Sequence, residues 1–165
     1  MSHAPDDSET TRVWDLVEKI GFCMLSTRDG EDIRARPMAA YVEREENRIY
    51  FLTDKDSYKE EEIEADPNVG LAFADAGKQT YVALTARAAL SNDREKIREI
   101  WSPAAKAWWD SPEDPSIRLL SVTPKDAQYW DNPGTVRSYI KMAAAALTDA
   151  RPALGDNEKV EMEHG

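Results

Sequence analysis

The sequence predicts an α+β protein in which an antiparallel sheet of about six strands closes into a small barrel. Six short segments are alternating or nearly continuously apolar, as strands are, and several are joined by tight turns. The helical segments gather at a few points of the chain instead of following every strand. Parallel winding is disfavoured because parallel strands need long crossovers, and short apolar strands favour closure into a barrel.

The expected strands are separated by turn signals, and the first two form a hairpin around "RDGED". The six segments are 22–27, 33–43, 48–53, 69–74, 80–91 and 117–124. A further short segment, "AQYW" at 127–130, can extend the sheet.

The helices are predicted from apolar spacing and from their capping residues. In the first, over 11–21, Val13, Leu16 and Val17 lie at helical spacing, and Gly21 is a stop signal. The other expected helices are 57–66 with Ser57 as N-cap, 93–101 capped by Asn92, 103–110 capped by Ser102, and 136–147.

The length of 165 residues is typical of one compact domain. We expect that domain over 12–150, after a polar and flexible N-terminal segment at 1–11. Residues 151–165 form an acidic C-terminal tail, of which a part can be ordered.

The charge of the chain argues against two classes of partner. It has 21 Lys and Arg residues against 32 Asp and Glu residues, a formal net charge of −11. We therefore expect no binding to nucleic acid and none to anionic membranes, since both depend on excess positive charge. The N-terminus lacks an apolar signal core and no segment approaches transmembrane length, so we expect a cytoplasmic protein.

Cysteine and histidine are too scarce for several kinds of site. Cys23 is the only cysteine, which excludes a disulfide within the chain and a thiolate metal cluster. The two histidines, His3 and His164, lie at the ends of the sequence. We therefore expect no metal site of the usual kind and no catalysis by an internal histidine.

The stretch "DIRARPMAAYV" contains the first candidate for binding. Arg34 and Arg36 are two residues apart, so in a strand both side chains point to the same face. Pro37 is typical of a strand edge or bulge. The two arginines suit either an anion-binding site or a solvated edge strand paired with surface carboxylates.

The second candidate is "TDKDSYK", where a strand ends at Thr53 and a helix is expected to start at Ser57. Free backbone N–H groups at a helix start favour a phosphate. Lys59 would oppose the helix dipole unless an anion lay beside it. Simple capping remains the alternative for Ser57.

The chain has five tryptophans, a residue that usually packs in the core. Trp108 and Trp109 are adjacent, so both cannot face one core, and a partner subunit or a ligand would cover one of them. The sequence contains no glycine-rich phosphate loop and no GxSxG motif, and no pair of carboxylates is marked out as an acid and base.

Several segments in one order resemble a known family. They are "GFCMLST", "IRARPM", "IYFLTDKDSYKEEEIEADPNVGLAFA", "YVALTARAALSND", "IREIWSPAAKAWW" and "DPSIRLLSVTPKDAQYWD". This series, over 12–162, is similar to the general stress protein branch of the pyridoxamine 5′-phosphate oxidase-like superfamily. The resemblance implies an α+β fold with a six-stranded antiparallel split β-barrel and flanking helices. It also implies a homodimer that binds FMN, with FAD left open, in a groove between the subunits.

The resemblance also implies roles for particular residues. Arg36 would meet the flavin phosphate, Met38 would line the isoalloxazine, and Trp130 would come from the other subunit. Tyr81 lies near the place where the oxidase has a glutamine facing the flavin. The cofactor-binding residues implied are Arg36, Pro37, Met38, Leu52, Thr53, Ser57, Tyr58, Lys59, Tyr81 and Trp130.

Two departures argue against pyridoxamine 5′-phosphate oxidation. Tyr41 stands where the oxidase has a substrate-binding lysine, and the internal histidine of the oxidase has no counterpart. The sequence assigns no catalytic residue and leaves three functions open. These are an FMN-dependent oxidoreductase, a non-catalytic flavin carrier or sensor, and a cofactor-free dimeric interaction module. Bleaching by NADH or NADPH would separate the first two, and failure to take up FMN would favour the third.

Overall fold

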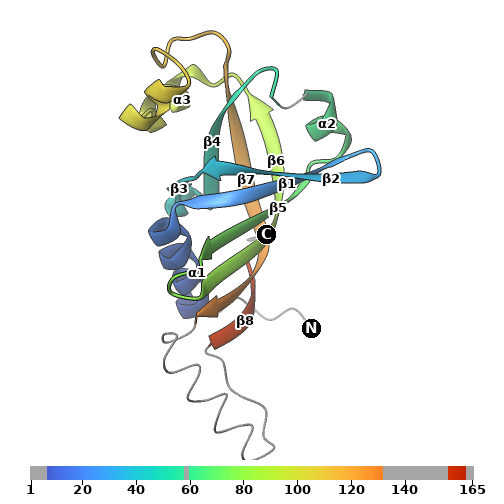
Figure 1. Ribbon diagram of the computed structural model, residues 1–165, viewed down its shortest axis with the longest axis vertical. Coiled ribbons are helices and arrows are strands. Elements are labelled where there is room, and N and C mark those ends of the chain that lie inside the picture. The colour runs from blue at the N-terminus through green and yellow to red at the C-terminus, as the bar shows by residue number, and fades with distance from the viewer. Residues whose placement is uncertain (1–6, 58–59, 132–155, 163–165) are drawn as a thin grey trace, which may run out of the picture.

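The computed structural model describes residues 7–57, 60–131 and 156–162 (Figure 1). Its strands are β1 Phe22–Asp29, β2 Asp32–Ala39, β3 Tyr41–Glu43, β4 Arg48–Asp54, β5 Asn68–Asp75, β6 Thr80–Ser91, β7 Ile117–Asp131 and β8 Asp156–Glu161. Its α-helices are α1 Asp7–Ile20, α2 Glu60–Ala65 and α3 Arg94–Ile100, and its 3-10 helices are η1 Arg44–Glu46 and η2 Pro103–Ala107. The helix expected over 136–147 lies outside the described residues.

The strands form one antiparallel sheet with the order β2-β1-β5-β6-β7-β4-β3, and β8 pairs with β7 beside this path. The antiparallel α+β class is thereby confirmed, whereas closure into a barrel stays a prediction. The count of six strands is wrong, because the described sheet has eight. One additional strand is β8, and the other arises where the expected segment 33–43 divides.

That segment divides at Ala40, where the chain changes its pairing partner. The Ala40 N–H donates to the carbonyl of Gly21 at 2.9 Å. Before it, β2 pairs with β1; after it, β3 pairs with β4. Ala40 alone therefore joins β2 and β3. These two strands lie at opposite ends of the strand order, although they are adjacent in the sequence.

β7 is one strand of 15 residues with an irregularity in its middle. Ala86 of β6 lies opposite Pro124, but Thr85 lies opposite Asp126, so Lys125 is an extra residue on β7. A bulge of this kind shifts the alternation of side chains by one. It accounts for the two segments, 117–124 and 127–130, that the sequence pattern suggests separately.

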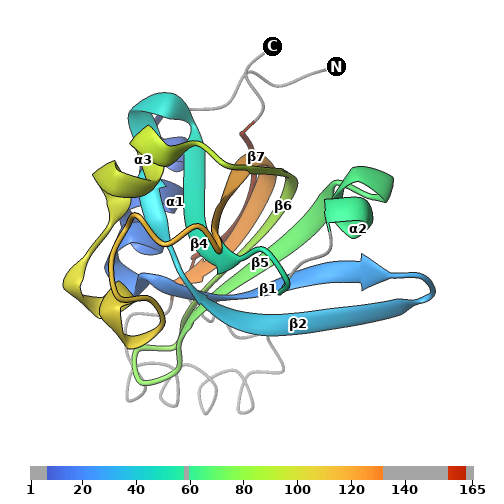
Figure 2. The same cartoon turned by 90° about the horizontal axis from the view of Figure 1, so that it is seen from above.

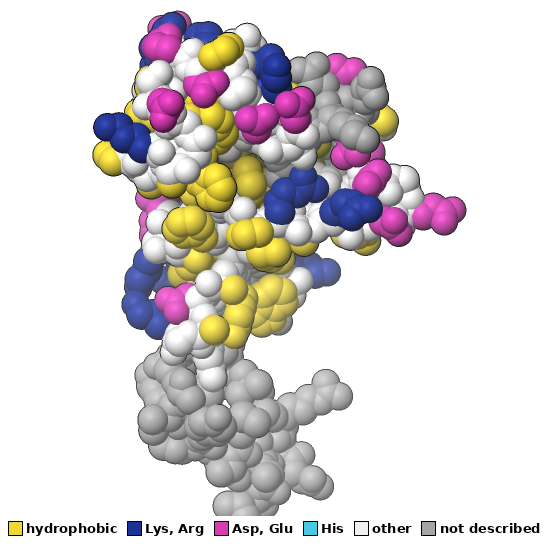
Figure 3. All heavy atoms as spheres, turned by 45° about the horizontal axis from the view of Figure 1, so that its top comes forward, with side chains coloured by type: hydrophobic (Ala, Val, Ile, Leu, Met, Phe, Trp, Pro, Cys, Tyr) yellow, Lys and Arg dark blue, Asp and Glu magenta, His cyan; other side chains and the backbone are white. Residues whose placement is uncertain are grey.

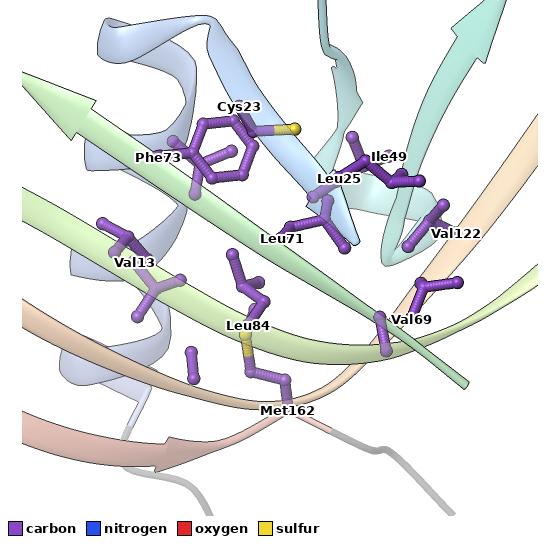
Figure 4. Packing of buried hydrophobic residues seen from close by; sticks show 14 of the residues in the cluster. Val13, Cys23, Leu25, Ile49, Val69, Leu71, Phe73, Leu84, Val122 and Met162 are labelled. Atoms are coloured by element: carbon purple, nitrogen blue, oxygen red, sulfur yellow. The ribbon is translucent and has the colours of Figure 1, made fainter. Parts of the chain in front are cut away.

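One side of the sheet carries the main core, and we call it the inward face. Leu25, Phe51 and Phe73 are fully buried there, and α1 adds Val13 and Val17. Figure 4 shows the core side chains between the strands of the sheet and α1. α1 ends before Gly21 as predicted, and the φ of +75° at that glycine suits a left-handed helix end.

α1 begins at Asp7, earlier than the expected helix over 11–21, and the flexibility expected for segment 1–11 stays a prediction. Glu9 lies in the first turn of α1, where a negative charge interacts favourably with the helix dipole.

The opposite side of the sheet, the outward face, is covered over β4 and the first half of β7 by a second cluster. α3 contributes Ile97 and Ile100, which pack on Leu52 and Leu119. Figure 2 shows α3 lying to one side of β4, away from the β1–β2 hairpin. The outward face is thus divided into a covered part and a part that no described element covers.

Two predicted caps differ from the structure. Asp93 is the N-cap of α3 in place of Asn92, and its carboxylate accepts from the Lys96 N–H at 3.1 Å. Ser102 precedes a 3-10 helix, η2, and makes no side-chain cap. Ser57 lies in the turn after β4, where its N–H donates to the Asp54 carbonyl at 2.9 Å, and its role as N-cap stays a prediction because residues 58–59 lie outside the described part of the chain.

The C-terminal segment is more ordered than its acidic composition suggests. β8 pairs with the second half of β7, and the side chains of Val160 and Met162 are 2% and 0% exposed. Figure 4 shows Met162 beside Leu84 in the main core. Residues of the expected tail 151–165 therefore complete the sheet and fill the core.

We expect Met162→Ala to destabilise the protein by about 2–5 kcal/mol, because it leaves a cavity in the main core. Glu161→Ala, at the exposed neighbouring position, is the control and should change the free energy of unfolding by less than about 0.5 kcal/mol. Urea unfolding measures both. Equal effects of the two variants would show that Met162 does not contribute to the core.

Candidate functional site

Arg36 lies on the inward face of β2, at the mouth of the main core. Its register partner on β1 is Leu25, which is fully buried, and directly opposed residues point to the same side of a sheet. The guanidinium donates to the Thr27 hydroxyl at 3.0 Å and to the Ser57 carbonyl at 3.4 Å. The side chain is therefore held between β1 and the turn before α2.

Thr27 is a site residue that the sequence analysis missed. It is 4% exposed and follows Cys23 and Leu25 on the inward face of β1. A polar residue in an inward position of an otherwise apolar strand is the signal that could have identified it. Its hydroxyl fixes the direction of the Arg36 guanidinium.

Arg34 shares the face of Arg36 but is engaged differently. Its Nε donates to the Asp29 carboxylate at 2.8 Å, across the β1–β2 hairpin. This hydrogen bond and the charge of Asp29 raise the pKa of Arg34 above its ordinary value. Of the two arginines, Arg34 thus follows the surface-pairing interpretation, and the less exposed Arg36 donates to a hydroxyl and a carbonyl.

Two more predicted residues lie on the same face as Arg36. Met38 is opposite Cys23 and packs against the main core. Thr53 is 4% exposed and continues the inward positions of Ile49 and Phe51 along β4. The inward face therefore carries the Arg36 guanidinium and the buried hydroxyls of Thr27 and Thr53.

The remaining predicted residues are not on this face or are not described. Leu52 belongs to the second cluster on the outward face, and Pro37 points outward on β2 opposite Met24. Tyr58 and Lys59 lie outside the described part of the chain, so the contact of Lys59 with an anion stays a prediction.

Tyr81 and Trp130 lie opposite each other on β6 and β7 and face outward. Their neighbours Val82 and Tyr129 are buried on the inward face, which fixes this orientation. Tyr81 is 39% exposed. The two aromatic side chains therefore form a pair on the uncovered part of the sheet.

Asp131 fixes the end of β7 directly after Trp130. Its carboxylate forms an ion pair with Arg12 of α1 and accepts from the Thr80 hydroxyl at 3.2 Å. Because Thr80 precedes Tyr81, this contact also holds β6 and β7 together beside the aromatic pair.

The predicted residues therefore form two groups on opposite faces of one sheet. The inward group contains Arg36, Met38 and Thr53, and the outward group contains Tyr81 and Trp130. Side chains on opposite faces of a sheet cannot contact one planar ligand from the same side. One chain thus presents two separate parts of the predicted site.

The uncovered part of the outward face is apolar, and we call it the outer apolar face. Phe22 is 66% exposed and Met24 is 42% exposed. The face is formed by Phe22, Met24, Ala39, Ala72, Ala74 and Tyr81. In Figure 3, apolar side chains gather on the side of the molecule that Figure 1 presents, with basic side chains beside them.

The two tryptophans that directly follow η2 have different surroundings, as the sequence predicts. Trp109 packs against the second cluster, whereas Trp108 is 79% exposed. Beside them, the Tyr41 and Ser102 hydroxyls lie 3.2 Å apart in a hydrogen bond. Tyr41 therefore joins β3 to η2 through a neutral contact.

Other kinds of site receive little support. A cleft of about 390 Å³ lies between the β1–β2 hairpin and α2, where Arg28 pairs with Asp66 at 3.8 Å, and the described residues that line it include none of the predicted ones. Among the described residues, no group of three His, Cys, Asp or Glu side chains could hold a metal. None of their helices is long and apolar enough to span a membrane.

The fold and these residues define a small α+β protein with one antiparallel sheet and a basic group at the mouth of its core. The family model of pyridoxamine 5′-phosphate oxidase-like proteins matches residues 8–153, and the chain belongs to this family.

Its relatives include general stress protein 26 of Bacillus subtilis, which is 35% identical over 85 residues. That match covers 47% of this chain and 58% of the Bacillus protein.

Solved structures show the same fold. A general stress protein 26 candidate from Jannaschia sp. CCS1 has a TM-score of 0.73 and 30% identity, with 94% of this chain and 98% of that chain covered. A general stress FMN/FAD binding protein from Xanthomonas citri has a TM-score of 0.69 and 25% identity, with 79% and 93% covered.

Cys23, opposite Met38, provides a test of the inward face. Burial raises the pKa of its thiol from 9.0 to about 12. At pH 8 only about one thiol in 10⁴ would be ionised, so we expect slow reaction with a disulfide reagent such as DTNB in the native protein and complete reaction in urea. Since the unfolded thiol ionises near 9.0 and the folded one near 12, native stability should fall as the pH rises between these values. Rapid labelling of the native protein would contradict this placement of Cys23.

Proposed function

We propose that this chain is a flavin-binding protein of the general stress type that binds FMN between two copies of itself. The observation that carries the proposal is Arg36, held at the mouth of the core by Thr27 and Ser57. The family and the flavin-binding relative from Xanthomonas citri support the choice of cofactor.

The inward group fits a flavin phosphate. Arginine binds phosphate through parallel charge-assisted hydrogen bonds, and Arg36 has its guanidinium already directed by a buried hydroxyl. The Thr53 hydroxyl lies on the same face, and Lys59 would supply a second cation. Arg36, Thr53, Ser57 and Lys59 would then hold the phosphate end of FMN.

The outward group fits the flavin ring only if a second chain supplies it. Trp130 and Tyr81 lie on the face opposite Arg36, so a single chain would leave one side of the ring uncovered. The outer apolar face provides surface that a second copy would bury, as in obligate homodimers. Two copies would together supply both groups to each flavin, with Met38 beside the ring.

When bound, flavin supplies electron and hydride transfer, and the protein binds and orients it. Tyr41 and Ser102 engage each other through neutral hydroxyls where the oxidase has a charged substrate contact. The chain is therefore proposed to lack pyridoxamine 5′-phosphate oxidation. Whether it is an oxidoreductase or a flavin carrier is decided by anaerobic mixing of the holoprotein with NADH or NADPH.

Arg36→Ala should weaken FMN binding by about 30- to 150-fold, the loss of a charge-assisted contact of about 2–3 kcal/mol. Riboflavin lacks the phosphate and should bind the wild type and the variant almost equally. Flavin fluorescence titration measures both ligands. A comparable loss for riboflavin would mean that Arg36 supports the fold or the ring instead.

Arg34→Ala is the matched control for this experiment, because it removes the other arginine of the same face. Arg34 is paired with Asp29 at the surface, so FMN affinity should change by less than about threefold. A larger effect than that of Arg36→Ala would assign the phosphate contact to Arg34.

Mixing two variants that each bind FMN weakly should restore tight binding if each flavin site uses two chains. Arg36→Ala and Trp130→Ala homodimers should each bind FMN weakly. In a mixture that exchanges subunits at random, about one site in four combines both wild-type residues. Recovery of that fraction of tight sites in a titration is the expected result. If mass spectrometry shows that the subunits have exchanged and tight binding is still not recovered, the shared site is contradicted.

A further inference from the structure

The bulge on β7 decides which face of the sheet carries Trp130. Before the bulge, the inward residues of β7 are Leu120 and Val122; after it, they are Ala127 and Tyr129. If Lys125 were a regular strand residue instead of a bulge, strict alternation from Leu120 and Val122 would turn Trp130 inward and Tyr129 outward. Trp130 therefore reaches the outer apolar face only because the bulge is maintained.

The C-terminal segment holds this bulge from outside the β6–β7 pair. The Lys125 carbonyl accepts a hydrogen bond from the Met162 N–H at 2.7 Å. Directly beyond the bulge, β8 pairs with residues 126–131 in continuous register from Glu161 to Asp156. The bulge residue and the strand that carries Trp130 are thus bonded to the same segment.

Met162 is itself fixed at two points. Its side chain is fully buried in the main core, and its carbonyl accepts from the Asn47 Nδ2 at 3.2 Å. Asn47 ends η1 in a left-handed conformation, with φ +54°. A chain of contacts therefore runs from the turn before β4, through Met162, to the bulge on β7.

We propose that Asn47 and Met162 are positioning residues for Trp130: they clamp the Lys125 bulge and so keep Trp130 on the outward face. This inference rests on the proposed flavin function, in which Trp130 covers the ring. It assigns to the C-terminal strand a role in ligand binding in addition to its contribution to the core.

Asn47→Gly is the test of the clamp. Glycine accepts the positive φ at this position, so the turn is kept while the amide contact with Met162 is lost. Glu45→Gly, in the same turn and exposed, is the matched control.

The first measurement needs no flavin. Amide hydrogen exchange should accelerate at residues 126–131 in Asn47→Gly, but not in Glu45→Gly and not in β5. Unchanged exchange at 126–131 would overturn the clamp. If the wild-type chain binds no FMN, the proposed function fails and this measurement alone decides the clamp.

The second measurement is FMN affinity in a double-mutant cycle with Trp130→Ala. Asn47→Gly should weaken binding about fivefold when Trp130 is present and less than about twofold when it is absent. Sedimentation should show the same assembly for Asn47→Gly as for the wild-type chain. Equal losses with and without Trp130 would show a general structural role and overturn the proposal.

Discussion

The two-residue period of the β-strand decides which side chains can meet in this protein, because one sheet carries both the core and the predicted site. Arg36 and Thr27 point inward from β2 and β1, while Tyr81 and Trp130 point outward from β6 and β7. A shift of one residue in any of these strands would exchange the two faces. The separation into two groups follows from this alternation, and it is the reason why the proposed flavin site uses a second chain.

Any attraction of an anion by nearby arginines is opposed by the negative charge of the whole chain. With a net charge of −11, an anion is repelled at long range, so a phosphate site depends on contacts at short range. The two arginines of β2 have different surroundings: Asp29 neutralises Arg34 at the surface, whereas Arg36 is held by a hydroxyl and a carbonyl. Because Arg36 is half-buried, salt screens its attraction for an anion less than it would screen that of an exposed lysine or arginine.

Much of the fold could be predicted from the sequence because its signals are local. The apolar alternation of β1, β5 and β6, and the stop at Gly21, depend on neighbouring residues only. The exact cap of α3 could not be predicted, since Asn92 and Asp93 are adjacent and both are good N-caps. In the structure the Asp93 side chain makes the cap. β8 has few apolar residues, and its burial depends on β7 and on Asn47, which are distant in sequence.

The site could be predicted only in part for the same reason. The resemblance and the strand period together place Arg36 correctly on a shared face with Arg34, and the same period would have revealed Thr27. No sequence pattern marks Lys125 as a bulge, because the extra residue is defined by its pairing with β6. The orientation of Trp130 therefore required the three-dimensional register.

The arrangement of the neutral hydroxyls also bears on the proposed flavin site. Tyr41 and Ser102 hydrogen-bond to each other, and neither side chain supplies a charge for an ionised substrate. Cys23 is buried with a pKa of about 12 and is no nucleophile at neutral pH. Thr27 and Thr53 are buried hydroxyls on the inward face, and hydroxyls of this kind orient a phosphate without transferring protons. In the proposed function these side chains would hold the flavin, and any reaction would depend on the flavin and on what reaches its exposed side.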